Sequence, residues 1–296
     1  MPSDVAEYGI DTWRIARYLP DDADVDRARL VCPEGRLADR VEGHVVGFIP
    51  GLRMIWAEGH PVDGSLAHPT ALQASYDRLL EALEVAQVPT GTDAGIARLD
   101  GTVTTTSPEG AHGLATLCGI AALDIPRIKP VVYGKPPQTV ALQGERSRKL
   151  YGRVYDKGYE SGAAAPGEVL RFEDQRRFTK DTRRAVSQVE PQADFERRFS
   201  ALARSAEGVR VVTLPVLARE MAERVNSGEV AIREAERLVG HLALNDAGAT
   251  RYPRRTLKRR RAELRDRGLV LADAFYEPIT VDLGQTFESV VAAWSA

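Results

Sequence analysis

The chain has 296 residues, of which 43 % are hydrophobic and 28 % charged, and its formal net charge is -2. These values are ordinary for a globular protein, so they exclude a chain that is disordered throughout. They also exclude a uniformly basic protein. Any binding of nucleic acid would therefore require a local cluster of positive charge. Only two cysteines occur, Cys32 and Cys118, far apart, which argues against a disulfide scaffold and a cysteine zinc site.

The amino-terminal stretch MPSDVAEYGIDTW lacks the basic start and apolar run of a signal peptide. No stretch of about 20 apolar residues follows that could cross a membrane. We therefore expect a soluble cytoplasmic protein without a membrane partner.

The first part of the chain predicts strands alternating with helices. Residues 8–19 are typical of a strand, and the short apolar runs of residues 28–58, broken by Gly and Pro, predict a hairpin or meander. Residues 69–87 carry apolar side chains at helical spacing behind a proline, which predicts an amphipathic helix. A strand is predicted at residues 95–105 and a helix, opened by serine and proline, at residues 108–123.

Three more strands are predicted at residues 139–144, 148–160 and 168–178. The order of elements predicts an α+β unit, a largely antiparallel sheet with packed helices, in a ferredoxin-like or split arrangement. We expect this unit to occupy residues 1–190. A second, helical domain is predicted over residues 191–296.

The second domain combines amphipathic helices with a basic helix at residues 254–267 and a short apolar strand, LVLADAF. This order resembles a helix-turn-helix or winged-helix unit. Cations crowd the segment between Arg251 and Arg267, opposed only by Glu263 and Asp266. Pairing along the helix cannot neutralise so many cations, so the segment predicts binding to phosphates, the alternative being a solvated charged helix. The residues expected to contact DNA are Arg254, Arg255, Lys258, Arg259, Arg261 and Arg265.

Three predicted strands carry an unusual set of polar side chains. Because strand side chains alternate between faces, Arg98 shares a face with Asp100, and Arg171 shares one with Glu173. On the strand between them, one face gathers Tyr151, Arg153, Tyr155 and Lys157. One surface of the sheet could thus combine carboxylates, tyrosines and cations.

Such a surface suits phosphodiester transfer. Carboxylates hold a hard divalent ion such as Mg²⁺ or Mn²⁺, which offsets charge developing on the phosphate. A tyrosine can attack phosphorus and form a covalent intermediate, and Lys157 and Arg171 are candidates to assist it or to bind phosphate oxygens. The structural alternative is that Arg-x-Asp and Arg-x-Glu on neighbouring strands form ordinary cross-strand ion pairs.

The order RLD, then LYGRVYDKGYE, then VLRFE resembles the replication initiators of filamentous phages and small rolling-circle plasmids. The likeness covers residues 95–178, and RYPRRTLKRRRAELRDRGLVL near residues 250–270 is similar to the end of the phage members. It implies a site-specific DNA endonuclease and strand transferase, which nicks and rejoins one strand at an origin through a phosphotyrosine with Mg²⁺ or Mn²⁺. The implied partners are origin DNA, duplex and single-stranded, and a host helicase; an oligomer is compatible with this role.

The metal ligands implied by the resemblance are Asp100 and Glu173. The implied nucleophile is Tyr155, with Tyr151 and Tyr159 as alternatives on the same strand face. The chain departs from many rolling-circle enzymes, since its histidines never occur at the His-hydrophobic-His spacing that holds metal in them.

The third metal ligand is therefore open. His112 is a candidate, although a histidine at the end of a helix is more often a surface residue. Two other functions fit the same sequence. One is a non-catalytic, sequence-specific DNA-binding regulator, and the other is a plasmid mobilisation relaxase.

Overall fold

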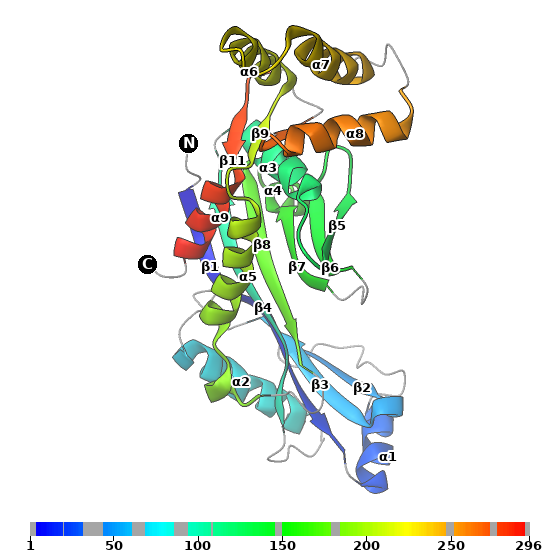
Figure 1. Cartoon of the computed structure of the whole chain (residues 1–296). Helices are drawn as coiled ribbons and strands as arrows, with labels where there is room; N and C mark the ends of the chain where they lie inside the picture. Colours follow the sequence, from blue (N-terminus) through cyan, green and yellow to red (C-terminus); the bar gives the residue numbers. More distant parts are fainter. Residues whose placement is uncertain are drawn as a thin grey trace. The chain divides into compact units, whose positions relative to one another are not determined.

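The computed structural model (Figure 1) describes residues 4–19, 21–31, 44–60, 69–85, 94–107, 109–145, 150–178, 184–246, 252–272 and 277–293. The described elements form a large sheet, a small sheet and helices, which confirms the predicted α+β class. No described helix is both long and apolar enough to cross a membrane.

The chain divides into two compact units, each assembled from separate stretches. Unit 1 comprises Met1–Ala6, Thr104–Phe172 and Arg198–Ala292. Unit 2 comprises Glu7–Val103, Glu173–Arg197 and Ala293–Ala296. The division into domains at residue 190 stays a prediction.

The large sheet has eight strands in the order β2-β3-β1-β4-β8-β7-β6-β5. They are β1 (Asp4–Tyr18), β2 (Val45–Ile49), β3 (Met54–Gly59), β4 (Gly95–Thr106), β5 (Ile128–Tyr133), β6 (Thr139–Gly144), β7 (Leu150–Asp156) and β8 (Val169–Arg177). The pairs β2–β3, β1–β3, β5–β6 and β6–β7 are antiparallel, as predicted. The expected hairpin is β2–β3, whereas β5 was not predicted.

Unit 2 has its own apolar core beneath α1 (Asp22–Val31) and α2 (Pro69–Val85). Leu79 and Leu83 on α2 are buried together with Trp13 and Ile15 of β1. The ring centroids of Trp13 and Tyr76 lie 6.0 Å apart. The apolar spacing that predicted α2 is thus the face that it buries.

Unit 1 contains a small sheet of β9 (Arg210–Val212), β10 (Leu269–Leu271) and β11 (Thr280–Asp282), in the order β10-β9-β11. β10 runs parallel to β9 and β11 antiparallel to it. The predicted strand LVLADAF is therefore shortened to β10, and its residues 273–275 lie outside the described part of the chain. α3 (Gly110–Ala122) packs against this sheet, together with α9 (Leu283–Ala292), which was not predicted.

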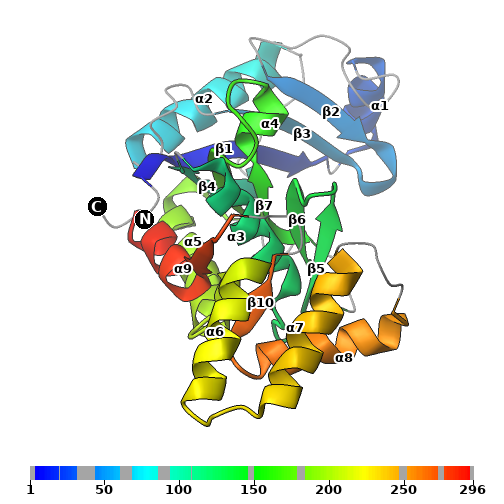
Figure 2. The ribbon, with the colours of Figure 1, turned by 90° about the horizontal axis from the view of Figure 1, so that it is seen from above.

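The helices α5 (Pro191–Ser205), α6 (Leu214–Asn226), α7 (Ile232–Asp246) and α8 (Arg254–Arg265) match the predicted helical segments. α6 and α7 lie side by side in both views (Figure 1 and Figure 2). A buried cluster joins α6, α7 and α8 to β9 and β10 through Leu217, Leu238, Leu264 and Leu269.

The predicted strand at residues 148–160 is wrong after Asp156. β7 ends at Asp156, and a short helix, α4 (Lys157–Ser161), follows. The carboxylate of Asp156 accepts hydrogen bonds from the backbone N–H of Tyr159 at 2.9 Å and of Gly167 at 2.7 Å. It therefore caps α4, as an aspartate at this position favours.

Gly119 tests the close packing of α3 on the small sheet. A Cβ there would lie 2.3 Å from Cγ2 of Val211 and 2.8 Å from Cδ1 of Leu283. We expect Gly119→Ala to lower the free energy of unfolding in urea by about 1–3 kcal/mol, because overpacking has to displace both neighbours. Gly240→Ala on α7, where a Cβ meets nothing within 4 Å, is the matched control and should stabilise the protein by about 0.5–1 kcal/mol. Equal stability of the two variants would contradict this account of α3.

Candidate functional site

Two buried carboxylates lie on neighbouring strands of unit 2. Asp100 belongs to β4 and Glu173 to β8, and these strands are adjacent in the sheet. Asp100 is 1 % exposed and Glu173 is 0 % exposed. The strand order therefore places two residues that are 73 positions apart in the sequence on adjacent strands.

Arg98 is the direct partner of Asp100. Its Nε donates to Oδ1 of Asp100 at 3.0 Å, and its Nη2 donates to Oδ2. Nε2 of Gln175, on β8, lies 3.5 Å from Oδ2 of Asp100. The contact of Arg98 with Asp100 fits the shared strand face predicted for them.

The ion pairing continues from Arg98 to β3 and β1. Nη1 of Arg98 lies 3.3 Å from Oε2 of Glu58, to which Nε of Arg14 also donates at 2.8 Å. The guanidinium of Arg14 lies over the ring of Trp56, 4.2 Å from its centroid. We call Arg14, Glu58, Arg98 and Asp100 the Arg98 network.

Burial and charge act in opposite directions in this network. Burial raises the pKa of Asp100, although the hydrogen bond and the charge of Arg98 act to lower it. For Arg98, burial acts to lower the pKa, but the bond to Asp100 and the charges of Asp100, Glu58 and Glu173 raise it overall. Arg98 therefore stays charged, and it interacts electrostatically with both predicted metal ligands, Asp100 and Glu173.

The donor chemistry of Asp100 and Glu173 suits a hard divalent ion, because Mg²⁺ is commonly bound through one or two carboxylates, waters and substrate phosphates. In the part of the chain that the structure describes, no three His, Cys, Asp or Glu side chains gather as a metal site. An ion at Asp100 would have to take this carboxylate from Arg98. His112, the candidate third ligand, lies on α3 in unit 1, with Nε2 2.7 Å from Oε2 of Glu109.

The predicted nucleophile, Tyr155, belongs to unit 1 and is only 4 % exposed. The guanidinium of Arg153 lies over its ring at 4.6 Å, and Nζ of Lys157 lies 6.0 Å from the ring centroid. Lys157 is the first residue of α4 rather than a strand residue, and its Nζ donates to Glu160 at 2.7 Å. Arg171, also buried, donates from Nε to Oγ1 of Thr104 at 3.0 Å.

Of the two alternative tyrosines, Tyr151 lies on β7 with Tyr155, and Tyr159 does not. Tyr159 lies on α4 and is 55 % exposed. The register of β7 with β6 shifts between Gly152 and Leu150, so strict alternation does not reach Tyr151. The guanidinium of Arg198, on α5, lies 4.8 Å from the ring centroid of Tyr151. Of the three rings, that of Tyr159 is the most accessible to a large substrate.

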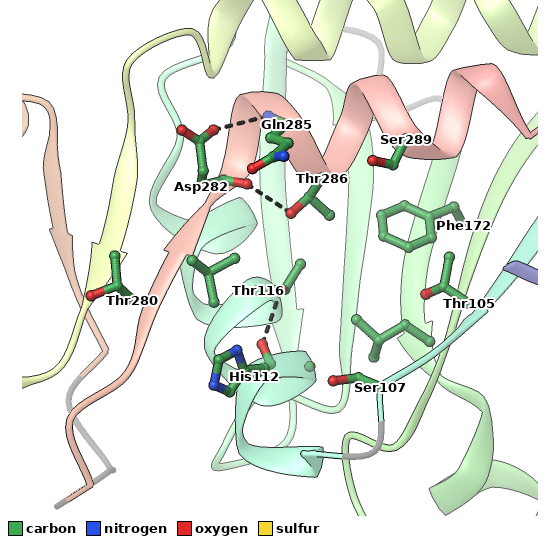
Figure 3. A pocket seen from close by; sticks show the side chains of 13 residues that line it. Thr105, Ser107, His112, Thr116, Phe172, Thr280, Asp282, Gln285, Thr286 and Ser289 are labelled. Atoms are coloured by element: carbon green, nitrogen blue, oxygen red, sulfur yellow. Dashed lines mark hydrogen bonds between the residues drawn. The ribbon is translucent and has the colours of Figure 1, made fainter. Parts of the chain in front are cut away.

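A polar pocket of about 260 Å³ lies within unit 1 (Figure 3). Its hydroxyl-bearing lining residues are Thr105, Ser107, Thr116, Thr280, Thr286 and Ser289. His112 on α3 and Gln285 on α9 also line it, and the backbone N–H of Gln285 donates to Asp282 at 2.9 Å. Nothing in the sequence predicted this pocket, because its residues come from separate segments without a common motif.

The basic helix α8 has one structural face and one exposed face. Arg260 is buried, donates from Nε to Nδ1 of His241 at 3.3 Å and from Nη1 to both oxygens of Glu263 at 2.7–2.8 Å. Leu264 is buried beside it, whereas Leu257 is only partly buried. The exposed cations are Arg255, Lys258, Arg259, Arg261 and Arg265. The side chain of Arg254 lies outside those that the structure describes.

The exposed cations Arg259 and Arg265 have contacts within the protein. Nε of Arg259 lies 3.7 Å from Oε1 of Glu263, and Nη1 of Arg265 donates to the carbonyl oxygen of Ala122 at 3.2 Å. α8 therefore presents a cationic surface, while its inner side is bonded to α7 through Arg260.

Glu263 makes the stability of this region depend on pH. Burial acts to raise its pKa, but the hydrogen bond from Arg260 and the charges of Arg260, Arg237 and Arg259 lower it below the ordinary value of 4.5. A lowered folded-state pKa gives stability that is present above the unfolded-state pKa and is lost as pH falls through the folded-state pKa. We expect Glu263→Gln to remove this part of the acid dependence of unfolding, measured by denaturant titration from pH 3 to 7. The exposed Glu236→Gln on α7 should leave the dependence unchanged, and identical profiles for both variants would contradict the role of Glu263.

Comparison with known proteins adds no relative: no protein-family model matches the chain, and no curated protein matches it either.

Proposed function

We propose that the protein is a rolling-circle replication initiator, which nicks and rejoins one DNA strand at an origin through a phosphotyrosine. The observation that carries the proposal is the placement of Asp100 and Glu173, from the Arg-x-Asp and Arg-x-Glu motifs, on adjacent strands around Arg98. The exposed cations of α8 support the DNA-binding part of the proposal. The origin DNA and a host helicase are its proposed partners.

In this proposal the large sheet is a relaxase-like or ferredoxin-like nicking platform. Asp100 and Glu173 would hold a Mg²⁺ or Mn²⁺ ion, which would supply positive charge next to the phosphate. Arg171 and Lys157 bind phosphate oxygens, and Arg153 beside Tyr155 stabilises the negative charge of a phenolate. The helices α6–α8 with the small sheet act as a winged-helix-like DNA reader, although β9 lies between β10 and β11, unlike a wing of two directly paired strands.

Replacing the tyrosines tests the nicking reaction. We expect the wild type, mixed with Mn²⁺ and single-stranded DNA of its own replicon, to form a covalent adduct that survives a denaturing gel. Tyr155→Phe should abolish the adduct, because the phenol oxygen that bonds to phosphorus is gone. Tyr151→Phe and Tyr159→Phe are the matched controls and should retain it.

An undiminished adduct in Tyr155→Phe would refute the assignment. Loss of the adduct in Tyr159→Phe instead would identify Tyr159, the exposed tyrosine on α4, as the nucleophile. Mapping the adduct by mass spectrometry identifies the tyrosine directly.

Charge removal on α8 tests DNA binding independently of cleavage. Each phosphate contact contributes about -0.9 to the slope of log K against log salt for duplex DNA. We expect Lys258→Gln and Arg261→Gln each to make the slope shallower by about 0.9, in fluorescence anisotropy with a duplex probe at several salt concentrations. Arg29→Gln, which removes an exposed cation of α1, should leave the slope unchanged. Equal slopes in all variants would exclude α8 as the phosphate-binding surface.

A non-catalytic DNA-binding regulator is the second candidate. The burial of Tyr155 and the bonding of both Asp100 oxygens to Arg98 favour it, since neither group is directly offered to a substrate. Salt-sensitive duplex binding without any adduct, in the presence or absence of Mn²⁺, would favour this candidate over the initiator.

A further inference from the structure

Arg98 stands between two carboxylates that accept its hydrogen bonds on different strands. It donates to both oxygens of Asp100, which lies on the same strand. Its third nitrogen, Nη1, reaches Oε2 of Glu58 on β3 at 3.3 Å. The three groups differ in exposure: the side chain of Asp100 is 1 % exposed, that of Arg98 19 % and that of Glu58 23 %.

The bond to Asp100 conflicts with a metal at the same carboxylate. A guanidinium bonded to both oxygens occupies one lone-pair position on each of them, and Nε2 of Gln175 lies 3.5 Å from Oδ2 as well. Two cations at one carboxylate repel each other strongly where little water is present. A divalent ion and Arg98 therefore compete for Asp100.

Glu58 offers Arg98 a second place. Glu58 is held by Arg14, whose Nε donates to it at 2.8 Å and whose Nη2 lies 2.6 Å away. Arg14 is in turn fixed over the ring of Trp56. Glu58 thus stays in position as an acceptor when Arg98 leaves Asp100.

We propose that Arg98 is a displaceable counter-ion. It neutralises Asp100 until a divalent cation binds to this carboxylate, and Arg98 is then held by Glu58 alone. Arg98 is thus a positioning residue that sets the affinity of the site for the cation. The inference rests on the proposed function for one point only, the role of Asp100 as a cation ligand. A fixed structural ion pair would show no such competition.

Mn²⁺ titration, followed by the electron paramagnetic resonance signal of the free ion, tests the competition without any DNA or turnover. Arg98→Gln removes the competing charge and should tighten Mn²⁺ binding at least tenfold. Glu58→Gln replaces the charged second acceptor by a neutral amide, which holds Arg98 more weakly, so Arg98 stays on Asp100 and Mn²⁺ binding should weaken several-fold. Asp100→Asn should abolish binding at this site.

Arg98→Lys is a second variant in case Arg98→Gln fails to fold. Circular dichroism checks that every variant is folded. A lysine keeps the charge but cannot bond both carboxylate oxygens in the planar geometry of a guanidinium, so its Mn²⁺ affinity should lie between those of wild type and Arg98→Gln. Affinities in Arg98→Gln and Arg98→Lys that equal or fall below that of wild type would overturn the inference. So would an absence of Mn²⁺ binding in all of these proteins.

The adduct assay is independent of the Mn²⁺ titration, so a failure of the initiator proposal can be distinguished from a failure of the counter-ion proposal. An adduct with Mn²⁺ affinity insensitive to Arg98 overturns the counter-ion and leaves the initiator. Tighter Mn²⁺ binding in Arg98→Gln without any adduct in the wild type supports the counter-ion and argues against nicking.

Discussion

Asp100 has to be neutralised where it lies, because a carboxylate with 1 % exposure cannot be solvated by bulk water. Arg98 meets this need with a bidentate pair, and the pairing sets the arrangement of the polar groups around it. Through Glu58 and Arg14, the same arginine joins β4 to β3 and β1, while Gln175 joins Asp100 to β8. Removing one partner of a buried pair typically destabilises a protein by about 3–5 kcal/mol. Arg98 therefore contributes to the stability of these strands, whatever its role in catalysis.

The Arg98 network shows that a structural and a functional interpretation of one motif need not compete. The Arg-x-Asp pattern is an ion pair within β4 in this structure, whereas the simpler alternative in the sequence predicted a pair between neighbouring strands. The same pair also places the positive charge of Arg98 next to Asp100 and Glu173, the two predicted metal ligands. A similar division occurs on α8, where Arg260 is fixed inside by Glu263 and the outer cations face solvent.

Much of the fold could be predicted because periodicity and turn residues report on local structure. The helix α2 and the strands β4 and β8 have clear periods, and each lies close to its predicted range. β9 has three residues and exists through its pairing with β10 and β11, so no local pattern marks it. The strand predicted through Lys157 failed for a different reason, because the carboxylate of Asp156 caps a helix there.

The candidate site could be predicted only in part. The motifs identified Asp100 and Glu173, but not Glu58, Arg14 or Gln175, since their roles arise from strand order. A strand pattern also does not report depth, so the sequence could not show that Tyr155, the preferred nucleophile, is buried while the alternative Tyr159 is exposed.

The two hydrogen bonds of Asp156 close a loop between the end of β7 and Gly167, just before β8. Within this loop, Ala163 is exposed, and a Cβ at the neighbouring Gly162 would meet nothing within 4 Å. Because closing a longer loop adds entropy only slowly with length, extra residues at Ala163 should leave the capped base of the loop intact. The loop is therefore a suitable place for a fluorescent label or an affinity tag beside the tyrosines, because an insertion there leaves the sheet unaltered.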